Sequence, residues 1–220
     1  MSLNTSHFFV LLCMIGFVQA CSNTGPGKPN ELRINLDPSY PSVVLLGQRH
    51  VTQHATEFDF VSCVRDYLVD NNPNLNVIPE QQFIDDLYPF FERSTAPLHI
   101  SNFQQVAQHS VVREKFKQMN LRYLVWIFGD TDTVNQSGSM SCAVGPVGGG
   151  CFGYKTWHDE AQYDAQVWNV ENLSHAGSAS TQNSGTSYMP AVVVPIPILA
   201  GVRSEACDML ALRIERHIVL

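Results

Sequence analysis

The clearest strand signal in the chain is an apolar run, LRYLVWIF, that extends from Leu121 to Phe128. It is rich in aromatic and β-branched residues, which are enriched in strands. Asn120 stands before it and ends a predicted helix. The polar, Gly/Ser-rich segment from Gly129 to Gly150 follows, and its composition predicts a loop. The remaining segments are assigned on either side of this strand.

The segments before this strand alternate between strands and helices. Short apolar runs at Ser42–Gly47 and Leu75–Ile78 predict two strands. Thr56-Glu57-Phe58-Asp59 has the spacing of a capping box, and Pro79 is favoured in the first turn of a helix. The predicted helices cover residues 56–70, 80–90 and 103–119. Strands that alternate with helices in this way predict parallel pairing in this half of the chain.

The segments after this strand predict an antiparallel finish. Two strands are predicted at Phe152–Trp157 and Gln162–Val170, and a loop follows at Leu173–Ser187. An extended segment at Ala191–Leu199 and a C-terminal helix at Ser204–Leu220 complete the chain. Residues 158–161 join the two strands. Pro195 and Pro197 have no amide donors, so the extended segment is excluded from the centre of a sheet. The order predicts one α/β (α+β) domain over residues 39–220, with helices packed on a mixed sheet.

Composition and charge narrow the classes of partner. The formal net charge is −7 and only 15% of the residues are charged, below the usual share of about 25%. Nucleic-acid binding depends on cations that neutralise phosphates, and adsorption to anionic lipid depends on them too. A nucleic-acid partner is therefore not expected, and attachment to a membrane would have to be hydrophobic or covalent.

The beginning of the chain predicts export. Phe8–Phe17 is uninterruptedly apolar but too short to span a bilayer, and its length suits a signal peptide over residues 1–20. Val18-Gln19-Ala20-Cys21 is similar to the lipobox of bacterial lipoproteins, which predicts lipidation at Cys21 and a flexible tether over residues 21–38. Two alternatives remain open: ordinary cleavage that leaves Cys21 free, and a leader that forms a helix of the folded domain.

Four cysteines remain when Cys13 and Cys21 are assigned to the leader and the anchor. An even number in an oxidising compartment predicts two disulfides, with three connectivities possible. Cys142 and Cys151 flank a Gly-rich segment that a bond would order. Cys63 and Cys207 each lie on the apolar stripe of a predicted helix, so they pair if those helices pack together. The alternative is that both are buried thiols.

No catalytic motif and no cofactor are predicted. Gly148–Thr156 (GGGCFGYKT) is one residue out of register with a phosphate-binding loop, because Tyr154 stands where that motif needs lysine. Gly185-Thr186-Ser187-Tyr188-Met189 resembles a nucleophile elbow, but Met189 replaces the final Gly. A small envelope hydrolase that uses Ser187 is therefore the alternative function.

No metal site is predicted either, although two sets of residues carry side chains that can bind metal. His50 and His54 are four residues apart, with Glu57 nearby, but they precede the helix cap rather than share a helix face. Asp130, Asp132 and Asn135 offer oxygen atoms, yet the glycine and the closing Glu of a calcium loop are missing. A metal- or ligand-binding lipoprotein thus remains a minor alternative.

Aromatic residues gather on the two strands after the Gly-rich segment. Tyr154, Trp157, Tyr163 and Trp168 are the residues of a possible interaction patch. Period-two alternation puts Tyr154 with Phe152 on one face and Trp157 with Lys155 on the other. Most of these rings are expected in the core, with an exposed subset available for contact.

The order of the elements resembles that of small envelope lipoproteins. The lipobox is followed by a first strand, the helix segment FVSCVRDYL (Phe60–Leu68) and the strand LRYLVWI (Leu121–Ile127). The group includes the curli secretion channel subunit, the lipoprotein activator of penicillin-binding proteins and the N-terminal domain of the Tol-system propeller protein. The resemblance covers Ser42–Val170. It implies a non-catalytic module that contacts another envelope protein. Ser22 follows Cys21, and the absence of Asp at this position predicts anchoring on the periplasmic side of the outer membrane.

Overall fold

The structure, a computed structural model, describes residue 37 and residues 39–49, 55–146 and 148–218. These residues belong to the second of the two compact units into which the chain divides, Ile34–Leu220. The predicted signal peptide, Cys21, the tether apart from its residue 37, and the two histidines His50 and His54 lie outside the described residues.

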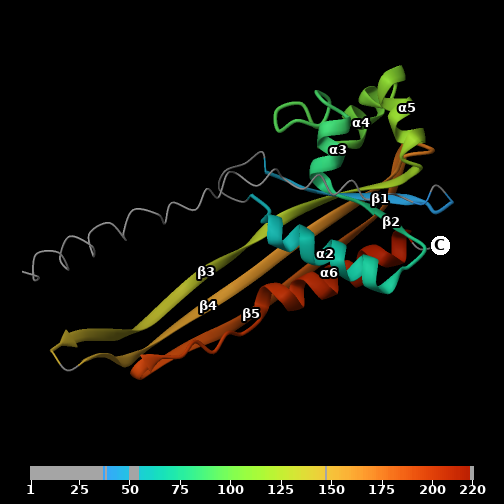
Figure 1. The fold of residues 1–220 in the computed structure, drawn as a ribbon. Helices are drawn as coiled ribbons and strands as arrows, with labels where there is room; N and C mark the ends of the chain where they lie inside the picture. The colour runs from blue at the N-terminus through green and yellow to red at the C-terminus, as the bar shows by residue number, and fades with distance from the viewer. Residues whose placement is uncertain (1–36, 38, 50–54, 147, 219–220) are drawn as a thin grey trace, which may run out of the picture. The chain divides into compact units, whose positions relative to one another are not determined.

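One five-stranded mixed sheet forms the centre of this unit, in the order β2-β1-β3-β4-β5 (Figure 1). Its strands are β1 (Ser42–Gly47), β2 (Asn76–Ile78), β3 (Leu121–Gly145), β4 (Gly148–Asn169) and β5 (Ser174–Pro195). β1 runs parallel to both β2 and β3, whereas β3, β4 and β5 are antiparallel neighbours. The predicted parallel beginning and antiparallel finish are confirmed.

Among the described residues, five helices cover the two faces of the sheet at the end where all five strands meet. They are α2 (Phe58–Asn71), α3 (Glu80–Asp86), α4 (Ile100–Val106), α5 (Ser110–Gln118) and α6 (Val202–Ile218). α2 and α6 lie side by side on one face, and α3 to α5 lie on the other (Figure 1). None of the described helices is long and apolar enough to cross a membrane. The predicted fold class, a mixed sheet with helices packed on it, is confirmed.

The central strand explains why the sheet has two cores. Val125 and Ile127 point into the core beneath α2 and α6, whereas Leu124 and Trp126 point into the core beneath α3 to α5. A strand that is covered on both faces needs apolar residues at successive positions, and Tyr123–Ile127 supplies them. Burial of these side chains is the main stabilising contribution at this end.

The three C-terminal strands are much longer than the sequence indicates. Residues 129–145, 158–161 and 174–187 were expected to be loop, and all three segments are strand. The turn of the β3–β4 hairpin lies between Gly145 and Gly148. Backbone hydrogen bonds hold a strand whatever its side chains, so a Ser/Thr/Gly-rich sequence with no apolar alternation forms strands here.

Two helical predictions are also wrong in detail. The Thr56 side chain does not cap α2: its hydroxyl is buried and donates to the carbonyl oxygen of Ile127 at 3.1 Å. A tertiary hydrogen bond has therefore replaced the predicted capping box. The predicted helix over 103–119 is two helices, α4 and α5. The backbone of His109 is extended, so the helix is interrupted there and α5 begins at the next residue.

The edge position of the Pro-rich segment is confirmed. β5 is the outermost strand and ends at Pro195. The chain then turns back along it, and Tyr188 and Ile198 exchange two backbone hydrogen bonds of 2.9 and 2.7 Å. Pro197 lies next to this bridge on the outer side, where it interrupts no ladder in the described residues.

Candidate interaction surface

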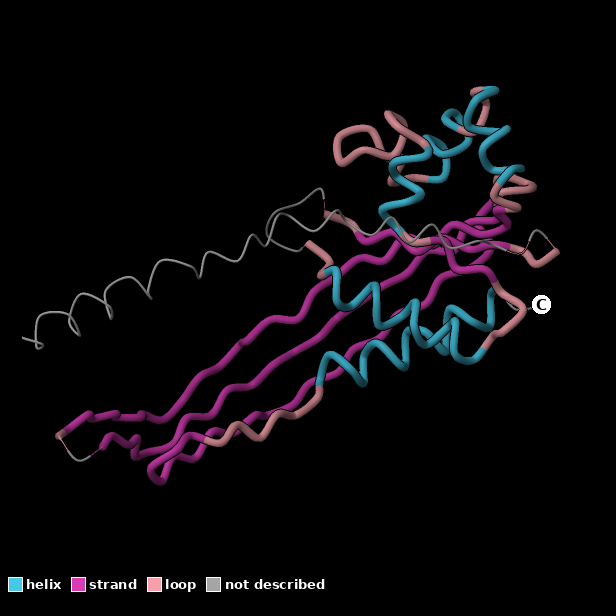
Figure 2. The backbone as a smooth tube through the Cα atoms, in the orientation of Figure 1, coloured by secondary structure: helices cyan, strands magenta, loops and turns pink. Residues whose placement is uncertain are grey.

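β3, β4 and β5 continue beyond the helices that cover one end of the sheet (Figure 2). β1 pairs with β3 only as far as Ile127, so three strands remain beyond that point. We call residues 133–145 of β3, 148–158 of β4 and 185–195 of β5 the distal sheet. We call the helix-covered end, with β1, β2, residues 121–127 of β3, 165–169 of β4 and 174–179 of β5, the proximal sheet.

Large apolar side chains are exposed on the distal sheet and on the segment that returns along β5. They are Val134, Val144, Phe152, Tyr154, Tyr188, Val192, Val193, Val194, Ile196, Ile198 and Leu199. Directly opposed residues of a sheet share a face, and Phe152 stands opposite Val192. These two side chains are 61% and 79% exposed. Exposed apolar side chains that share a face of a sheet in this way are typical of a contact surface.

The same region is almost without charge. Lys155 is the one Lys, Arg, Asp or Glu residue in the segments 133–158 and 185–202. The chain as a whole has 33 such residues among its 220, so their near absence from the distal sheet is a local feature. Depletion of charged residues with enrichment of aromatic ones distinguishes the cores of interfaces from ordinary surface.

A disulfide holds the end of the distal sheet. Cys142 and Cys151 are opposed in β3 and β4, and their sulfurs are bonded with a Cα–Cα distance of 4.0 Å. The predicted bond is therefore present, but it links two paired strands rather than the ends of a loop. The short Cα–Cα distance identifies a non-hydrogen-bonded pair, in which the facing side chains are closest.

The four aromatic residues of the predicted patch do not form one surface. Tyr154 is 60% exposed and lies on the distal sheet, and Trp157 is half-buried opposite Ser187. Tyr163 and Trp168 are fully buried, and they lie in the two different cores. The prediction of a joint patch is wrong for these two, because they stand on the helix-covered part of β4.

Tyr163 lies where the helix-covered part of the sheet ends. Its hydroxyl donates to Glu57 at 2.7 Å and lies 2.8 Å from the hydroxyl of Thr131. Its ring stacks on Phe60 with the centroids 3.4 Å apart. Burial raises the pKa of the Tyr163 hydroxyl, so the ring stays neutral and donates its proton. Glu57 is thereby held between the start of α2 and strands β3 and β4.

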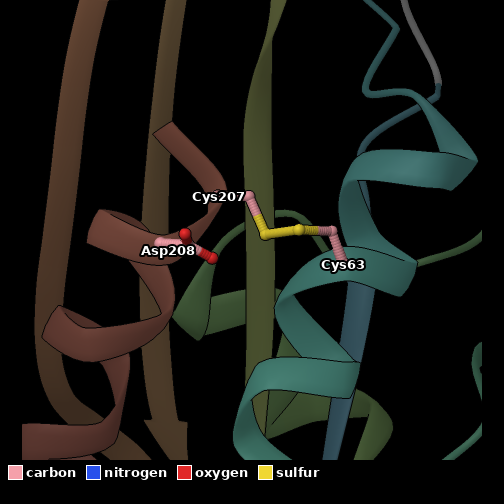
Figure 3. Close-up of side chains that lie close together, drawn as sticks. All are labelled: Cys63, Cys207 and Asp208. Atoms are coloured by element: carbon pink, nitrogen blue, oxygen red, sulfur yellow. A yellow bond between two sulfur atoms is a disulfide. The ribbon is translucent and has the colours of Figure 1, made fainter. Parts of the chain in front are cut away.

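A second disulfide joins α2 and α6. Cys63 and Cys207 are bonded with a Cα–Cα distance of 6.2 Å, and the Asp208 carboxylate lies beside them (Figure 3). The pairing expected if these helices pack side by side is present. Among the described residues these three could in principle surround a metal ion, but both sulfurs are committed to the disulfide and offer no thiolate.

A cavity of about 440 Å³ lies beside this disulfide, and Ser187 is one of its wall residues. The Ser187 side chain is 2% exposed, and its oxygen accepts a hydrogen bond from the backbone N–H of Ala200 at 3.1 Å. His158 stands on the neighbouring strand opposite Thr186, one position away, so it points to the other face of the sheet. Ser187 here fixes the segment that returns along β5.

The three residues with calcium-type oxygen atoms lie in strand β3. Asp130 and Asp132 are opposite Gln162 and Glu160 of β4, and Asn135 is opposite His158. A strand spreads successive side chains over two faces, whereas a calcium loop wraps its ligands around one point. In the described residues these three do not meet other potential ligands in a cluster.

Sequence reasoning missed two parts of this surface. Val192 was assigned to an extended segment without a partner, and the return of Ile196 and Ile198 along β5 was not expected. One signal was present in the sequence: two long segments that lack charge despite an acidic chain. Their exposure could not be deduced, because uncharged segments of this kind also fill cores.

The chain matches no protein-family model, and no curated protein sequence matches it. Solved structures that resemble it include the lipoprotein GNA1162 from Neisseria meningitidis, with 9% identity over 80% of this chain and 99% of that chain and a TM-score of 0.35. They also include the hypothetical protein CT253 from Chlamydia trachomatis, with 10% identity over 82% and 94% and a TM-score of 0.26. At such TM-scores the likeness supports no conclusion about function.

Proposed function

We propose that this chain is an exported lipoprotein of the bacterial cell envelope that acts as a non-catalytic interaction or assembly module. Its contact surface is the distal sheet. The observation that carries the proposal is the exposure of large apolar side chains such as Phe152, Tyr154 and Val192 in a region with a single charged residue. Such a surface gains free energy when a partner removes it from water.

The anchor in this proposal is a lipid on Cys21, which follows an apolar leader of signal-peptide length. Ser22 follows the cysteine, and the absence of Asp there is typical of lipoproteins sorted to the outer membrane. The proposed location is therefore the periplasmic side of that membrane. The proposed partner is another envelope protein, as the resemblance to the curli, penicillin-binding-protein activator and Tol-system lipoproteins implies.

The contact surface can be tested by removing its apolar side chains. We expect Phe152→Ser/Tyr154→Ser/Val192→Ser to lower recovery of envelope partners by about tenfold, since hot-spot side chains carry most of an interface's energy. The measurement is quantitative cross-linking in intact cells followed by mass spectrometry.

The matched control replaces three exposed apolar side chains elsewhere, Tyr88→Ser/Val111→Ser/Leu212→Ser, which are 71%, 64% and 42% exposed. This variant should keep its partners within about twofold, as scattered surface residues do. If both triple variants recovered the same amount of envelope partners, the distal sheet would not be the contact surface. Turnover of a substrate by the purified protein would remove the non-catalytic role.

The anchor is tested by two cysteine variants. Cys21→Ala should abolish the acyl mass at the mature N-terminus and release the protein from the membrane fraction. Cys13→Ala lies inside the leader and should leave both unchanged. An intact native polypeptide that still begins at Met1 would contradict export.

A further inference from the structure

β3 has an open edge along the distal sheet. In the described residues its outer side pairs with β1 up to Ile127, and no strand pairs with it beyond that point. Proteins protect such edges with lysine, proline or covering segments, because an open edge is a template for another strand. Residues 133–145 (TVNQSGSMSCAVG) contain no charged residue and no proline. The opposite edge, on β5, is covered at Tyr188 by Ile198.

The disulfide fixes which backbone groups of β3 face outward. Cys142 and Cys151 are a non-hydrogen-bonded pair, so the N–H and C=O of Cys142 point away from β4. The register is unbroken from Asn135 to Gly145, and the outward direction alternates. The residues with outward backbone groups are Gln136, Gly138, Met140, Cys142 and Val144. Tyr188 obeys the same alternation in β5, and its outward groups bond to Ile198.

We propose that two copies of this chain pair through these edges, with β3 of one copy antiparallel to β3 of the other across a two-fold axis at Met140. This register opposes Gln136 to Val144 of the second copy and Gly138 to Cys142, so every outward group finds a partner. The ladder over residues 135–145 is about 35 Å long, at roughly 3.4 Å per residue. The inference rests on the proposed function, since it names a partner for the distal sheet.

Side chains at the axis also suit a second copy. Ser139 faces Ser141 of the second copy in the closest pairs, and Ser137 faces Ala143, so small residues stand where strands approach most tightly. The nearest acid on the strand, Asp132, would lie beyond the end of the ladder, far from its counterpart. Because β5 is already covered, further copies cannot add at the other edge by β3–β5 pairing. The assembly closes as a two-fold dimer.

The register is tested with a pair of double variants of the mature, oxidised chain. In Ser139→Lys/Ser141→Lys, the lysine at position 139 of each copy faces the lysine at position 141 of the other copy. These two like-charge pairs should raise the dimer Kd by about tenfold or more. Ser139→Lys/Ser141→Glu places opposite charges there and should keep the Kd within about threefold of the wild type. Sedimentation equilibrium measures Kd, and circular dichroism with a free-thiol count verifies the fold and the disulfides.

Three results would overturn the pairing: a wild-type chain that stays monomeric over a hundredfold range of concentration, two double variants with the same Kd, or a dimer that the lysine pair leaves intact. None of these outcomes bears on the cross-linking experiment, which measures how many other envelope proteins the distal sheet recovers. Conversely, the wild-type chain could form the predicted dimer while the serine triple variant keeps all its envelope partners. That result would contradict the proposed envelope contact and leave the β3–β3 pairing in place.

Discussion

The proximal and distal sheets share strands β3, β4 and β5, yet different forces hold them. In the proximal sheet both faces of β3 are buried, and Leu124 and Val125 are fully covered by helices. In the distal sheet Phe152 and Val192 are exposed, and the strands are held by their backbone ladder and by Cys142–Cys151. A strand can therefore extend well past its hydrophobic core where a disulfide closes its end, and the surface so displayed is available for contact.

The two disulfides provide the largest expected contrast between the halves. Cys63 and Cys207 are 144 residues apart, whereas Cys142 and Cys151 are 9 apart. On the loop-entropy model, replacing Cys63 and Cys207 together by Ala lowers the free energy of unfolding by about 5 kcal/mol, and replacing Cys142 and Cys151 lowers it by about 2.5 kcal/mol. Urea unfolding of both double variants measures this. Equal losses would show that the distal bond stabilises the whole unit as much as the bond beneath the helices.

Truncation of one aromatic residue in each half should give the next largest difference. Trp168 is fully buried and lies 5.2 Å from Phe103 between ring centroids, so Trp168→Ala should cost about 3–5 kcal/mol. Tyr154 is 60% exposed, and Tyr154→Ala should change stability by less than about 0.5 kcal/mol. Thermal unfolding of the two variants provides the test. A loss above 1 kcal/mol for Tyr154 would mean that the distal sheet has a packed core of its own.

The sequence predicted the proximal half well and the distal half poorly. The run LRYLVWIF and the apolar stripes around Cys63 and Cys207 reflect burial, and burial leaves a period that a sequence shows. Residues 129–145 and 174–187 form strands mainly through their backbone ladders, and the few side chains that they bury, such as Ala179 and Thr181, are too small to leave an apolar pattern. Long-range effects explain the other errors: Thr56 was expected to cap a helix, but it donates to Ile127 instead.

Tyr163 stands at the boundary between the halves and makes stability depend on pH. Its pKa in the folded state is raised above the value near 10 of an unfolded tyrosine, so the neutral form is favoured on folding. That contribution is fully present below about pH 10 and is lost as the pH rises further. Tyr163→Phe should cost about 1–2 kcal/mol at pH 7 by removing the bond to Glu57.

The measurement for Tyr163 is urea unfolding at pH 7, 9 and 10.5 for wild type and variant. The wild type should lose more stability than Tyr163→Phe between the two higher values. Tyr154→Phe, a change of the same kind at an exposed position, should follow the wild type. Parallel curves for all three proteins would show that the buried hydroxyl does not link folding to pH.

The smallest expected effect concerns a single hydroxyl within the distal sheet. Ser187 accepts a hydrogen bond from the N–H of Ala200 and is almost completely buried, so Ser187→Ala leaves that donor without this partner. The expected cost is about 1 kcal/mol, and Ser184→Ala on the exposed face should cost less than about 0.5 kcal/mol. Limited proteolysis after Ala200 would also accelerate in Ser187→Ala alone, since the segment returning along β5 is then less firmly held. If instead Ser187→Ala abolished an esterase or peptidase activity of the wild type while leaving stability unchanged, the hydroxyl would be a nucleophile, and the distal sheet would be part of an enzyme.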